Sequence, residues 1–503
     1  MKLEISRTST LGIRLGRISS WEAQSVSIPT PTALIYTRGG LVPHLTHENV
    51  EAYLDLPSAS SLYLLPIQTL ADAESCLRAN PGQDIRSYCG LRKEQKLLLS
   101  FSDPGSRPQS GYNTTRTSSF FGRGGRRKMQ AVDMFRAAEA LGAQSFQALP
   151  DSDNPPDAAE KRLRKSVERS KAHAGVAADA IQQAVPPKVY SLFLTHTGGY
   201  QRDIRAAATD SINSFPKITG VFFEGFHAFG DLSNFTVNDC LRELLLEATG
   251  KLRPDLMRIF PGSLNPGQVL ALSELGMDAF DTSYASFLAD ANKALVLGDQ
   301  FPAQAEDWQC VSILEPSFRE AQEPLCENCP CYTCRSYNRA YLHHLASTEE
   351  LLWPILLMIH NLREYLRMQK EKPPPLPDAD LVSSPDPDSN LRHYVLRVPP
   401  DESPVEADYR RRRAELEAWN QDFWAEHNRA FLKGRAEFSA AKLAESGRTT
   451  LSSEETAEFH KSFLDSRWQP LLAYNWAWYG RNFSLVLPAA KVSLMRLLRR
   501  LRR

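Results

Sequence analysis

The chain lacks several features that would place it at once in a class of protein. Its 59 basic and 59 acidic residues cancel, which excludes a strongly basic coat for nucleic acid but leaves local basic patches possible. No apolar run approaches the roughly 20 residues that cross a bilayer. The first residues, MKLEISRTSTLGIRLG, have neither the apolar core nor the small-residue cleavage site of a signal peptide. We therefore expect a soluble globular protein in a reducing compartment.

Cysteine is scarce, yet it is concentrated in one place. The chain has 8 cysteines, and four of them fall between Cys326 and Cys334 in the stretch CENCPCYTC. Such a cluster holds a metal ion, performs redox chemistry or staples a loop by disulfides. In a reducing compartment, metal binding is the favoured interpretation.

The spacing within this cluster suits zinc. A structural zinc ion takes four thiolate or imidazole ligands, and C-x-C-x2-C lets one loop supply three of them, Cys329, Cys331 and Cys334. The fourth ligand must come from another segment. His360 is a candidate because it is the one imidazole in the apolar helical pattern ELLWPILLMIHNLREYL, although a hydrogen-bonded core histidine would have the same pattern. Three further side chains compete for the fourth position: Cys326, His343 and His344.

The middle of the chain alternates between strand-like and helix-like segments. Apolar stretches at 188–196, 218–225 and 277–283 are separated by helical patterns, two of which begin at the cap residues Asn238 and Asn265. Repeated strand–helix units predict a parallel sheet covered by helices. An open doubly wound sheet and a closed (β/α)8 barrel both fit, and the absence of an evident reversal favours the α/β barrel.

Composition divides the chain into three parts. We expect a barrel over 1–372, with a zinc-binding subdomain at about 310–370. Residues 373–404 are rich in Pro, Asp and Ser and predict a linker. Residues 405–503 predict a helical extension that ends in the basic amphipathic sequence KVSLMRLLRRLRR. This end is typical of a segment that contacts an anionic membrane or tRNA phosphate, or that frays in water.

The loops that follow the predicted strands supply a candidate site. In a (β/α)8 barrel these loops meet at one face, where the active site is built. They contain 196–199, 224–227, 261–263 and Asp281. Asp281 has the position of a nucleophile or a general base, and Phe226 or Phe229 is available to stack on a base. Taken singly, an aspartate at a strand end is more often a helix cap or a turn residue.

The motif C-x-C-x2-C-x25-H resembles the zinc signature of the tRNA-guanine transglycosylases, and the flanking RSYNRAYLHHL and MIHNLREY are similar to that family as well. The segments TPTALIYTRGGLVPHLT, RIFPGS and GMDAFDTS extend the resemblance over roughly 1–370. It implies a (β/α)8 barrel with one zinc ion per subunit, held by Cys329, Cys331, Cys334 and His360. It also implies exchange of guanine in a tRNA anticodon for a modified base, queuine at the wobble position in eukaryotes. Asp281 would be the nucleophile.

Several positions depart from the family pattern. The acid/base run Asp-Ser-Gly-Gly-Phe-Gln is missing, and its nearest remnant is 102–105. The base-reading runs become Thr-Gly-Gly at 197–199, Glu-Gly-Phe at 224–226 and LPDSDNP around 150–153, and Thr282 replaces a cysteine. Because acid–base catalysis alone contributes about 10²–10⁴-fold, a site with these losses should be slow.

The resemblance therefore implies a non-catalytic member that pairs with a catalytic subunit in a heterodimer acting on tRNA. Such members occur in the cytoplasm and at the mitochondrial outer membrane, so a peripheral membrane contact is expected too. Two alternatives stay open: an active transglycosylase that uses Asp281, and a zinc-stabilised scaffold unrelated to queuine. The basic residues Arg123, Arg126, Arg127 and Lys128 are the local candidates for phosphate contact, and a solvated loop is the alternative.

Overall fold

A computed structural model of the chain describes residues 2–8, 12–21, 24–54, 56, 61–107, 109, 112–122, 124–184, 189–230, 235–302, 304–370, 381–386, 388–395, 403–446 and 452–502. The chain divides into two compact units, Met1–Lys372 and Pro373–Arg503. Among the described residues, none of the helices combines the length and apolar character that a bilayer span requires.

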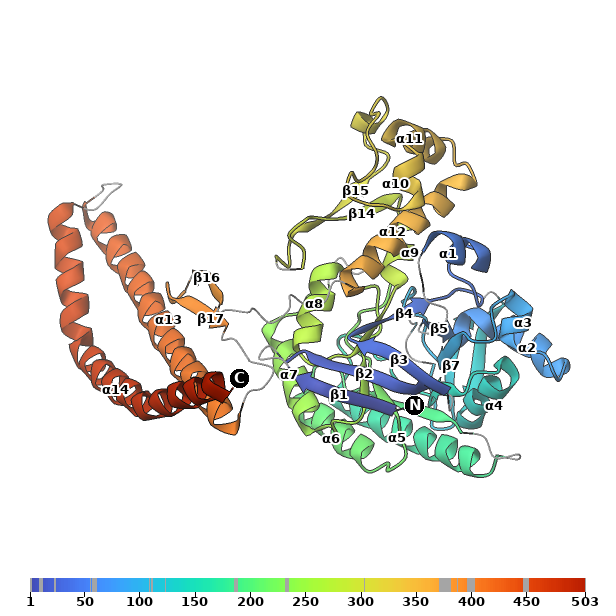
Figure 1. Cartoon of the computed structure of the whole chain (residues 1–503), viewed down its shortest axis with the longest axis horizontal. Coiled ribbons are helices and arrows are strands. Elements are labelled where there is room, and N and C mark those ends of the chain that lie inside the picture. Colours follow the sequence, from blue (N-terminus) through green and yellow to red (C-terminus); the bar gives the residue numbers. More distant parts are fainter. Residues whose placement is uncertain are drawn as a thin grey trace. The chain divides into compact units, whose positions relative to one another are not determined.

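The first unit is built on a closed barrel of eight parallel strands (Figure 1). In order around the barrel the strands are β10 (Ser191–His196), β11 (Gly220–Phe223), β12 (Met257–Ile259), β13 (Ala279–Asp281), β4 (Thr32–Tyr36), β5 (Leu62–Pro66), β6 (Lys96–Ser100) and β9 (Ser145–Gln147). The barrel closes where β6 pairs with β9 and β9 with β10. This closure confirms the predicted (β/α)8 barrel and excludes the open doubly wound sheet.

The strands are buried on both faces, which explains their nearly continuous apolar sequences. Alternate side chains, including Leu64, Phe193 and Ile259, fill the barrel interior. The interior is closed at the N-terminal end by an antiparallel sheet of β1 (Lys2–Thr8), β2 (Arg14–Trp21) and β3 (Gln24–Thr30). Buried Trp21 and Ile18 of this sheet belong to the same apolar cluster as the interior side chains.

Helices surround the barrel: α1 (His47–Tyr53), α2 (Ile67–Ala79), α3 (Ile85–Cys89), α4 (Ala131–Leu141), α5 (Glu160–Gln182), α6 (Arg202–Asn213), α7 (Asp239–Lys251), α8 (Pro266–Glu274) and α9 (Ser283–Asp290). The predicted caps are present, since Asn238 accepts from the backbone amide of Leu241 and Asn265 forms a capping box with Gln268. A hairpin of β7 (Thr117–Gly122) and β8 (Gly125–Gln130) lies between β6 and α4.

A subdomain follows α9. It contains the antiparallel pair β14 (Lys293–Leu297) and β15 (Trp308–Ser312), a short 3-10 turn (Pro316–Phe318), α10 (Tyr332–Ser336), α11 (Arg339–Ser347) and α12 (Leu352–Lys370). Helix α12 packs against both α9 and β14, which joins the subdomain to the barrel.

The second unit is a helical hairpin with a small sheet. It contains β16 (Leu381–Pro385), β17 (Arg392–Val395), α13 (Pro404–Ser446) and α14 (Ser453–Arg502). The two strands lie within the segment predicted as a linker, and α14 continues through the basic end of the chain. Aromatic rings hold the helices together, with the rings of Phe423 and Tyr474 stacked at 4.1 Å between centroids.

Candidate metal centre and barrel mouth

Four buried side chains meet in the subdomain after α9. The Sγ atoms of Cys329, Cys331 and Cys334 and a ring nitrogen of His360 all lie within 4.8 Å of one another. Cys331 caps α10, and its sulfur accepts from the backbone amide of Cys334 at 3.3 Å. The short motif therefore forms one turn of chain whose thiols point to a common centre, and α12 brings His360 to it.

A backbone carbonyl fixes the orientation of His360. Its Nε2 donates to the carbonyl oxygen of Leu295 on β14 at 2.8 Å, which leaves Nδ1 toward the thiols. Nδ1 lies 3.6 Å from the sulfur of Cys331 and 3.3 Å from that of Cys334. This is the arrangement of a metal-binding histidine, in which a second partner of the ring selects the tautomer.

The donor set fits zinc. Tetrahedral zinc with Zn–S near 2.3 Å and Zn–N near 2.0 Å places sulfur and nitrogen about 3.5 Å apart, close to the observed separations. Hydrogen bonds from the neighbouring thiols of Cys329 and Cys334 lower the pKa of Cys331, because its thiolate is the accepting form. Zinc held here would cross-link α10 to α12 and complete a closed structural site.

The competing ligands lie outside this cluster. The side chain of His344 is exposed, and His343 contacts the hydroxyl of Ser347 at 3.4 Å. Cys326 is buried nearby but is not one of the four converging groups. The structure thus brings together the four residues that the sequence suggested.

At the opposite end of the barrel from the N-terminal sheet, Asp281 ends β13. Its Oδ2 accepts from the amide of Gly262 at 2.7 Å and its Oδ1 from the amide of Ser283 at 2.9 Å. Complete burial raises the pKa of Asp281 to about 6, and the charge of Asp103 adds to the shift. Asp103 itself accepts from the hydroxyl of Tyr36 at 2.7 Å. The carboxylates of Asp281 and Asp103 are therefore close enough at the barrel mouth for the charge of Asp103 to affect the pKa of Asp281.

The raised pKa of Asp281 predicts a pH effect on stability. The folded pKa of about 6 exceeds the ordinary value of 3.8, so the folded state binds the proton more tightly. Protonation of Asp281 therefore contributes about 3 kcal/mol to the free energy of unfolding below about pH 4, and this contribution is lost as the pH rises through 6. Asp281→Asn should flatten the pH profile of urea unfolding between pH 4 and 7 by up to that amount. Parallel wild-type and variant profiles would contradict the assignment.

Glu224 follows β11, two strands away from β13, and occupies the mouth with its own hydrogen bonds. Its carboxylate accepts from the amide of Gln147 at 2.7 Å, the hydroxyl of Ser152 at 2.5 Å and that of Ser102 at 3.4 Å. Burial raises the pKa of Glu224. The strand-end carboxylate is thus tied to strand β9 and to the loops that follow β9 and β6, and both of its oxygens already accept hydrogen bonds.

Arg205 and Phe226 fill the space beside Glu224. The buried guanidinium of Arg205 on α6 donates to three carbonyl oxygens, those of His196 (2.7 Å), Gly199 (2.9 Å) and Glu224 (2.7 Å). It lies 3.6 Å from the ring centroid of Phe226, and the ring of Phe226 also stacks on that of Phe260, with centroids 5.7 Å apart. Phe226 is 2% exposed. The expectation that Phe226 stacks on a base is wrong, because its faces pack against side chains of the same chain.

The remaining departures also have structural roles. The Oγ1 of Thr282 accepts from the amide of Tyr36 at 3.0 Å, joining β13 to β4. The carboxylate of Asp151 accepts from Arg162 and Asn113, and burial, together with the charge of Asp151, raises the pKa of Asp153 to about 6. These contacts stabilise the loops instead of presenting polar groups to a ligand.

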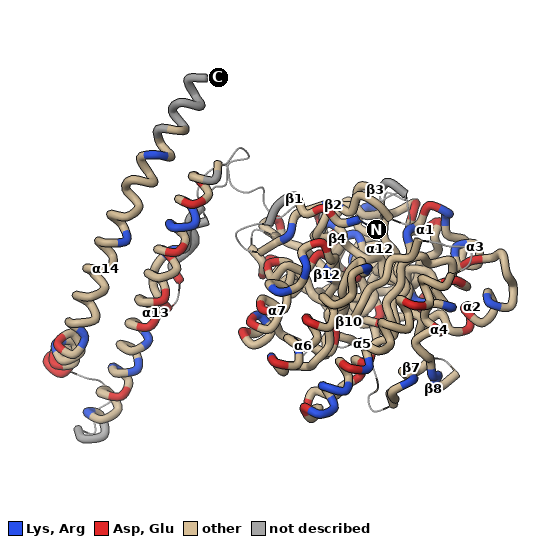
Figure 2. The backbone as a smooth tube through the Cα atoms, turned by 90° about the horizontal axis from the view of Figure 1, so that it is seen from below, with Lys and Arg blue, Asp and Glu red and all other residues tan. Residues whose placement is uncertain are grey.

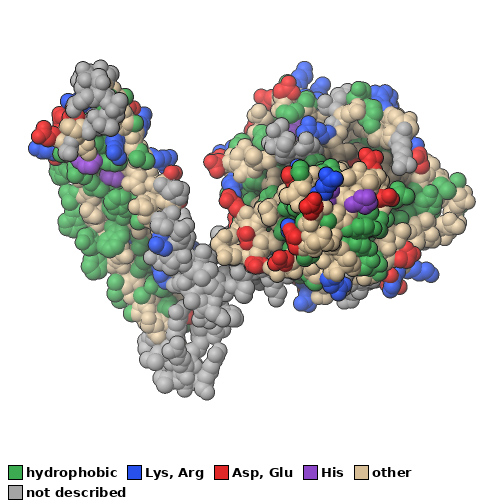
Figure 3. All heavy atoms as spheres, turned by 90° about the horizontal axis from the view of Figure 1, so that it is seen from above, with side chains coloured by type: hydrophobic (Ala, Val, Ile, Leu, Met, Phe, Trp, Pro, Cys, Tyr) green, Lys and Arg blue, Asp and Glu red, His purple; other side chains and the backbone are tan. Residues whose placement is uncertain are grey.

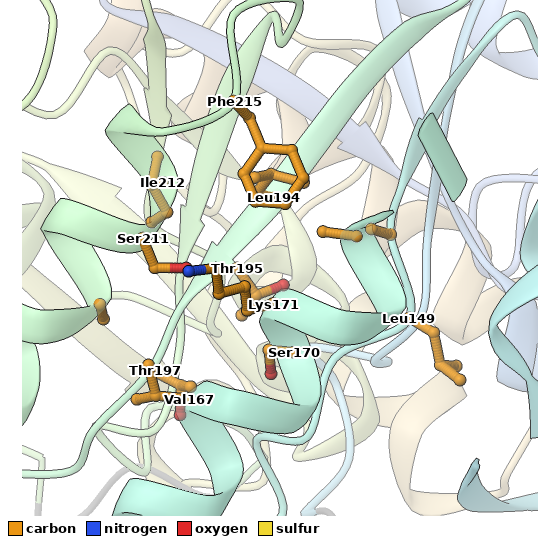
Figure 4. Close-up of a pocket in the computed structure, with 13 residues that line it drawn as sticks. Leu149, Val167, Ser170, Lys171, Leu194, Thr195, Thr197, Ser211, Ile212 and Phe215 are labelled. Carbon is orange, nitrogen blue, oxygen red and sulfur yellow. The ribbon is translucent and has the colours of Figure 1, made fainter. Parts of the chain in front are cut away.

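A small cavity opens outside the barrel wall, between α5, α6 and β10 (Figure 4). Its volume is about 20 Å³, enough for roughly one water molecule. The apolar side chains of Leu194, Ile212 and Phe215 line it. The cavity is too small for a nucleobase.

The barrel and its subdomain match a family of known proteins. The family model described as "Queuine tRNA-ribosyltransferase" matches residues 11–372. The chain belongs to the queuine tRNA-ribosyltransferase family. It is similar to "Queuine tRNA-ribosyltransferase accessory subunit 2" of Caenorhabditis elegans, 30% identical over 370 residues that cover 74% of this chain and 96% of the relative. The protein of the same name from Ixodes scapularis is 31% identical over 359 residues, 68% and 88% of the two chains.

A second family model, "Cytochrome c oxidase assembly factor 8", matches residues 379–498. This match lies within the second unit, while the queuine tRNA-ribosyltransferase match covers the barrel and its subdomain. The two units of the chain are therefore similar to two different protein families. In the sequence of the second region we identified a helical pattern, and no motif indicated this relationship.

The candidate phosphate contacts lie on the β7–β8 hairpin of the barrel unit. Arg126 packs over the ring of Tyr112 at 5.0 Å, and Arg127 pairs with Asp72. Lys128 is in the same strand, whereas Arg123 falls outside the described residues. One of the predicted cations therefore already has an acidic partner.

Proposed function

We propose that this chain is the non-catalytic accessory subunit of a heterodimeric queuine tRNA-ribosyltransferase. It would support the exchange of guanine for queuine at the wobble position of tRNA anticodons. The observation that carries the proposal is the occupied barrel mouth, where Arg205, Phe226 and Glu224 bond and pack with one another. The clustered zinc ligands of the same family remain in place. A chain that keeps the metal-binding residues but fills the pocket at the barrel mouth is expected of a subunit that supports catalysis by its partner.

Base exchange with labelled queuine tests this proposal. The purified chain alone should incorporate no label into tRNA, and addition of the catalytic subunit should produce incorporation above that of the catalytic subunit alone. Exchange by the chain alone would instead support the second candidate, an active transglycosylase that uses Asp281, which its position beside Asp103 favours. In the heterodimer, Asp281→Asn should leave the rate nearly unchanged under the first proposal and abolish this chain's share under the second.

We propose that the catalytic subunit binds next to the zinc subdomain. A row of contacting rings leads from half-buried Tyr53 on α1 to Tyr341 at the surface of the subdomain, with ring centroids of Tyr53 and Tyr332 at 4.5 Å, Tyr332 and Tyr337 at 5.7 Å, and Tyr337 and Tyr341 at 5.6 Å. Tyr341 is 43% exposed. Exposed, ordered tyrosines are typical anchors of protein interfaces.

Tyr341→Ala should weaken the heterodimer by about tenfold to a hundredfold, since truncated interface anchors commonly cost 2 kcal/mol or more. Calorimetric titration of the catalytic subunit measures the change. Tyr88→Ala is the matched control, because Tyr88 on α3 is 52% exposed and lies outside the zinc subdomain. Equal affinity of both variants would place the interface elsewhere.

We also propose that the chain resides in the cytoplasm and contacts the mitochondrial outer membrane through its second unit, supported by the basic end of α14. A second candidate role for residues 379–498 is assistance in cytochrome c oxidase assembly, supported by the family match alone. Protease treatment of intact mitochondria separates the two. Digestion of the chain at the outer face supports the first, and protection inside supports the second.

A further inference from the structure

An uncovered apolar surface runs along α14. Large side chains recur every three or four residues on this helix and are exposed: Leu464, Trp468, Leu472, Trp476, Tyr479, Phe483 and Leu487. Trp476 is 73% exposed and Phe483 is 72% exposed. This spacing places the set, called here the α14 stripe, on one face of the helix. Figure 3 shows hydrophobic side chains gathered along this unit.

Packing against α13 does not account for the stripe. The rings of α14 that meet α13 include those of Phe459, Phe463 and Tyr474, which contact Phe438, Phe431 and Phe423 respectively. By helical spacing these rings lie on the face opposite the stripe. Helix α14 is therefore apolar on two faces and has a partner within the hairpin for one of them. A continuous exposed patch of this kind marks an interaction surface.

The charge of the helix indicates what covers it. From residue 466 to the end the chain has eight basic residues and no acidic one, with cations at Arg467, Arg481, Lys491, Arg496, Arg499, Arg500, Arg502 and Arg503. Figure 2 shows the acidic residues of α14 confined to its beginning. The whole chain, in contrast, is neutral. The stripe thus lies on a long segment whose charge attracts an anionic partner.

Two other occupants fit less well. A second copy packed stripe to stripe would bring two positive segments together, because residues 466–503 of each copy contain no carboxylate. A nucleic acid would need cations beside the stacking rings, yet the guanidinium of Arg481 lies over the ring of Trp419 on α13, at 4.6 Å. Helices that lie in a membrane surface combine Trp, Phe and Leu on one face with Lys and Arg on the other. Tryptophan and tyrosine also favour the depth of the lipid headgroups.

We propose that the α14 stripe docks on the surface of an anionic phospholipid bilayer, with the helix parallel to the membrane plane. The inference rests on the proposed membrane contact and assigns that contact to an apolar face, in addition to the basic end. The exposed rings would enter the boundary between headgroups and acyl chains, and the cations of the basic end, from Lys491 onward, would pair with lipid phosphates.

Vesicle flotation of the full chain tests the inference. The chain should float with vesicles of equal parts phosphatidylcholine and phosphatidylserine, and added salt should weaken this binding. Trp476→Ser/Phe483→Ser should lower the bound fraction at least about tenfold, because two large apolar side chains leave the interface. Tyr88→Ser/Leu246→Ser is the matched control, with exposures of 52% and 54%, and should bind like wild type.

A charge variant covers the event that the stripe variant misfolds. Arg499→Glu/Arg500→Glu keeps the stripe and should also lose binding to the mixed vesicles. Equal flotation with pure phosphatidylcholine, or full binding by the stripe variant, would overturn the inference. The inference would also be overturned if the wild-type chain formed a dimer or a tRNA complex and the stripe variant, but not the charge variant, lost it. Base exchange with the catalytic subunit in the absence of lipid should be the same for all variants, so its failure counts against the proposed function and not against the membrane contact.

Discussion

Cys334→Ser is expected to remove zinc from the chain and to unfold the subdomain that follows α9. Zinc bound by Cys329, Cys331, Cys334 and His360 would join α10 to α12, and structural zinc sites contribute their binding energy directly to folding. Metal content measured by mass spectrometry should fall from about one ion per chain to near none. Limited proteolysis should then cut between β15 and α12, and binding of the catalytic subunit should be lost.

Cys326→Ser is the control for this experiment. Cys326 is 8% exposed and belongs to the same apolar core, but it is not one of the four converging side chains. We therefore expect this variant to keep its zinc and its resistance to protease. Loss of zinc from Cys326→Ser, or full retention by Cys334→Ser, would show that the ligand set is wrong.

Arg205→Ala should be the most destabilising substitution at the barrel mouth. The buried guanidinium donates to the carbonyl oxygens of His196, Gly199 and Glu224, and its removal leaves all three without that donor. We expect a loss of about 3–5 kcal/mol in the free energy of unfolding of the barrel, read from urea denaturation. Burial lowers the pKa of Arg205 to about 9, so the side chain stays charged at neutral pH.

Arg202→Ala is the matched control, because Arg202 lies on the same helix, is 72% exposed and pairs with Glu247 at the surface. It should cost less than about 0.5 kcal/mol. Arg205→Lys should not restore stability, since an ammonium group cannot reproduce the planar fork of donors. Equal costs for Arg205→Ala and Arg202→Ala would show that Arg205 does not hold together the segments that follow β10 and β11.

The sequence analysis did not identify two important residues of the barrel mouth, Arg205 and Gln147. Arg205 occupies the same helical face as buried Ala208 and Ile212, and a cation on an apolar stripe was the available signal. Gln147 ends β9, a strand of three residues that was not identified. Both act through contacts with segments many positions away, such as Gln147 with Glu224.

The sequence by itself determined the local features. A spacing of two and three residues fixes three thiols in one turn around Cys331, and buried strands such as 191–196 follow from apolar periodicity. Tertiary structure decided what those features become. His360 reaches the thiols only because α12 packs on β14, and the mouth is filled because Arg205 and Phe226 arrive there from different elements. Periodicity and spacing act over a few residues, whereas barrel closure depends on pairing between distant strands, so the state of the pocket could not be read from the chain alone.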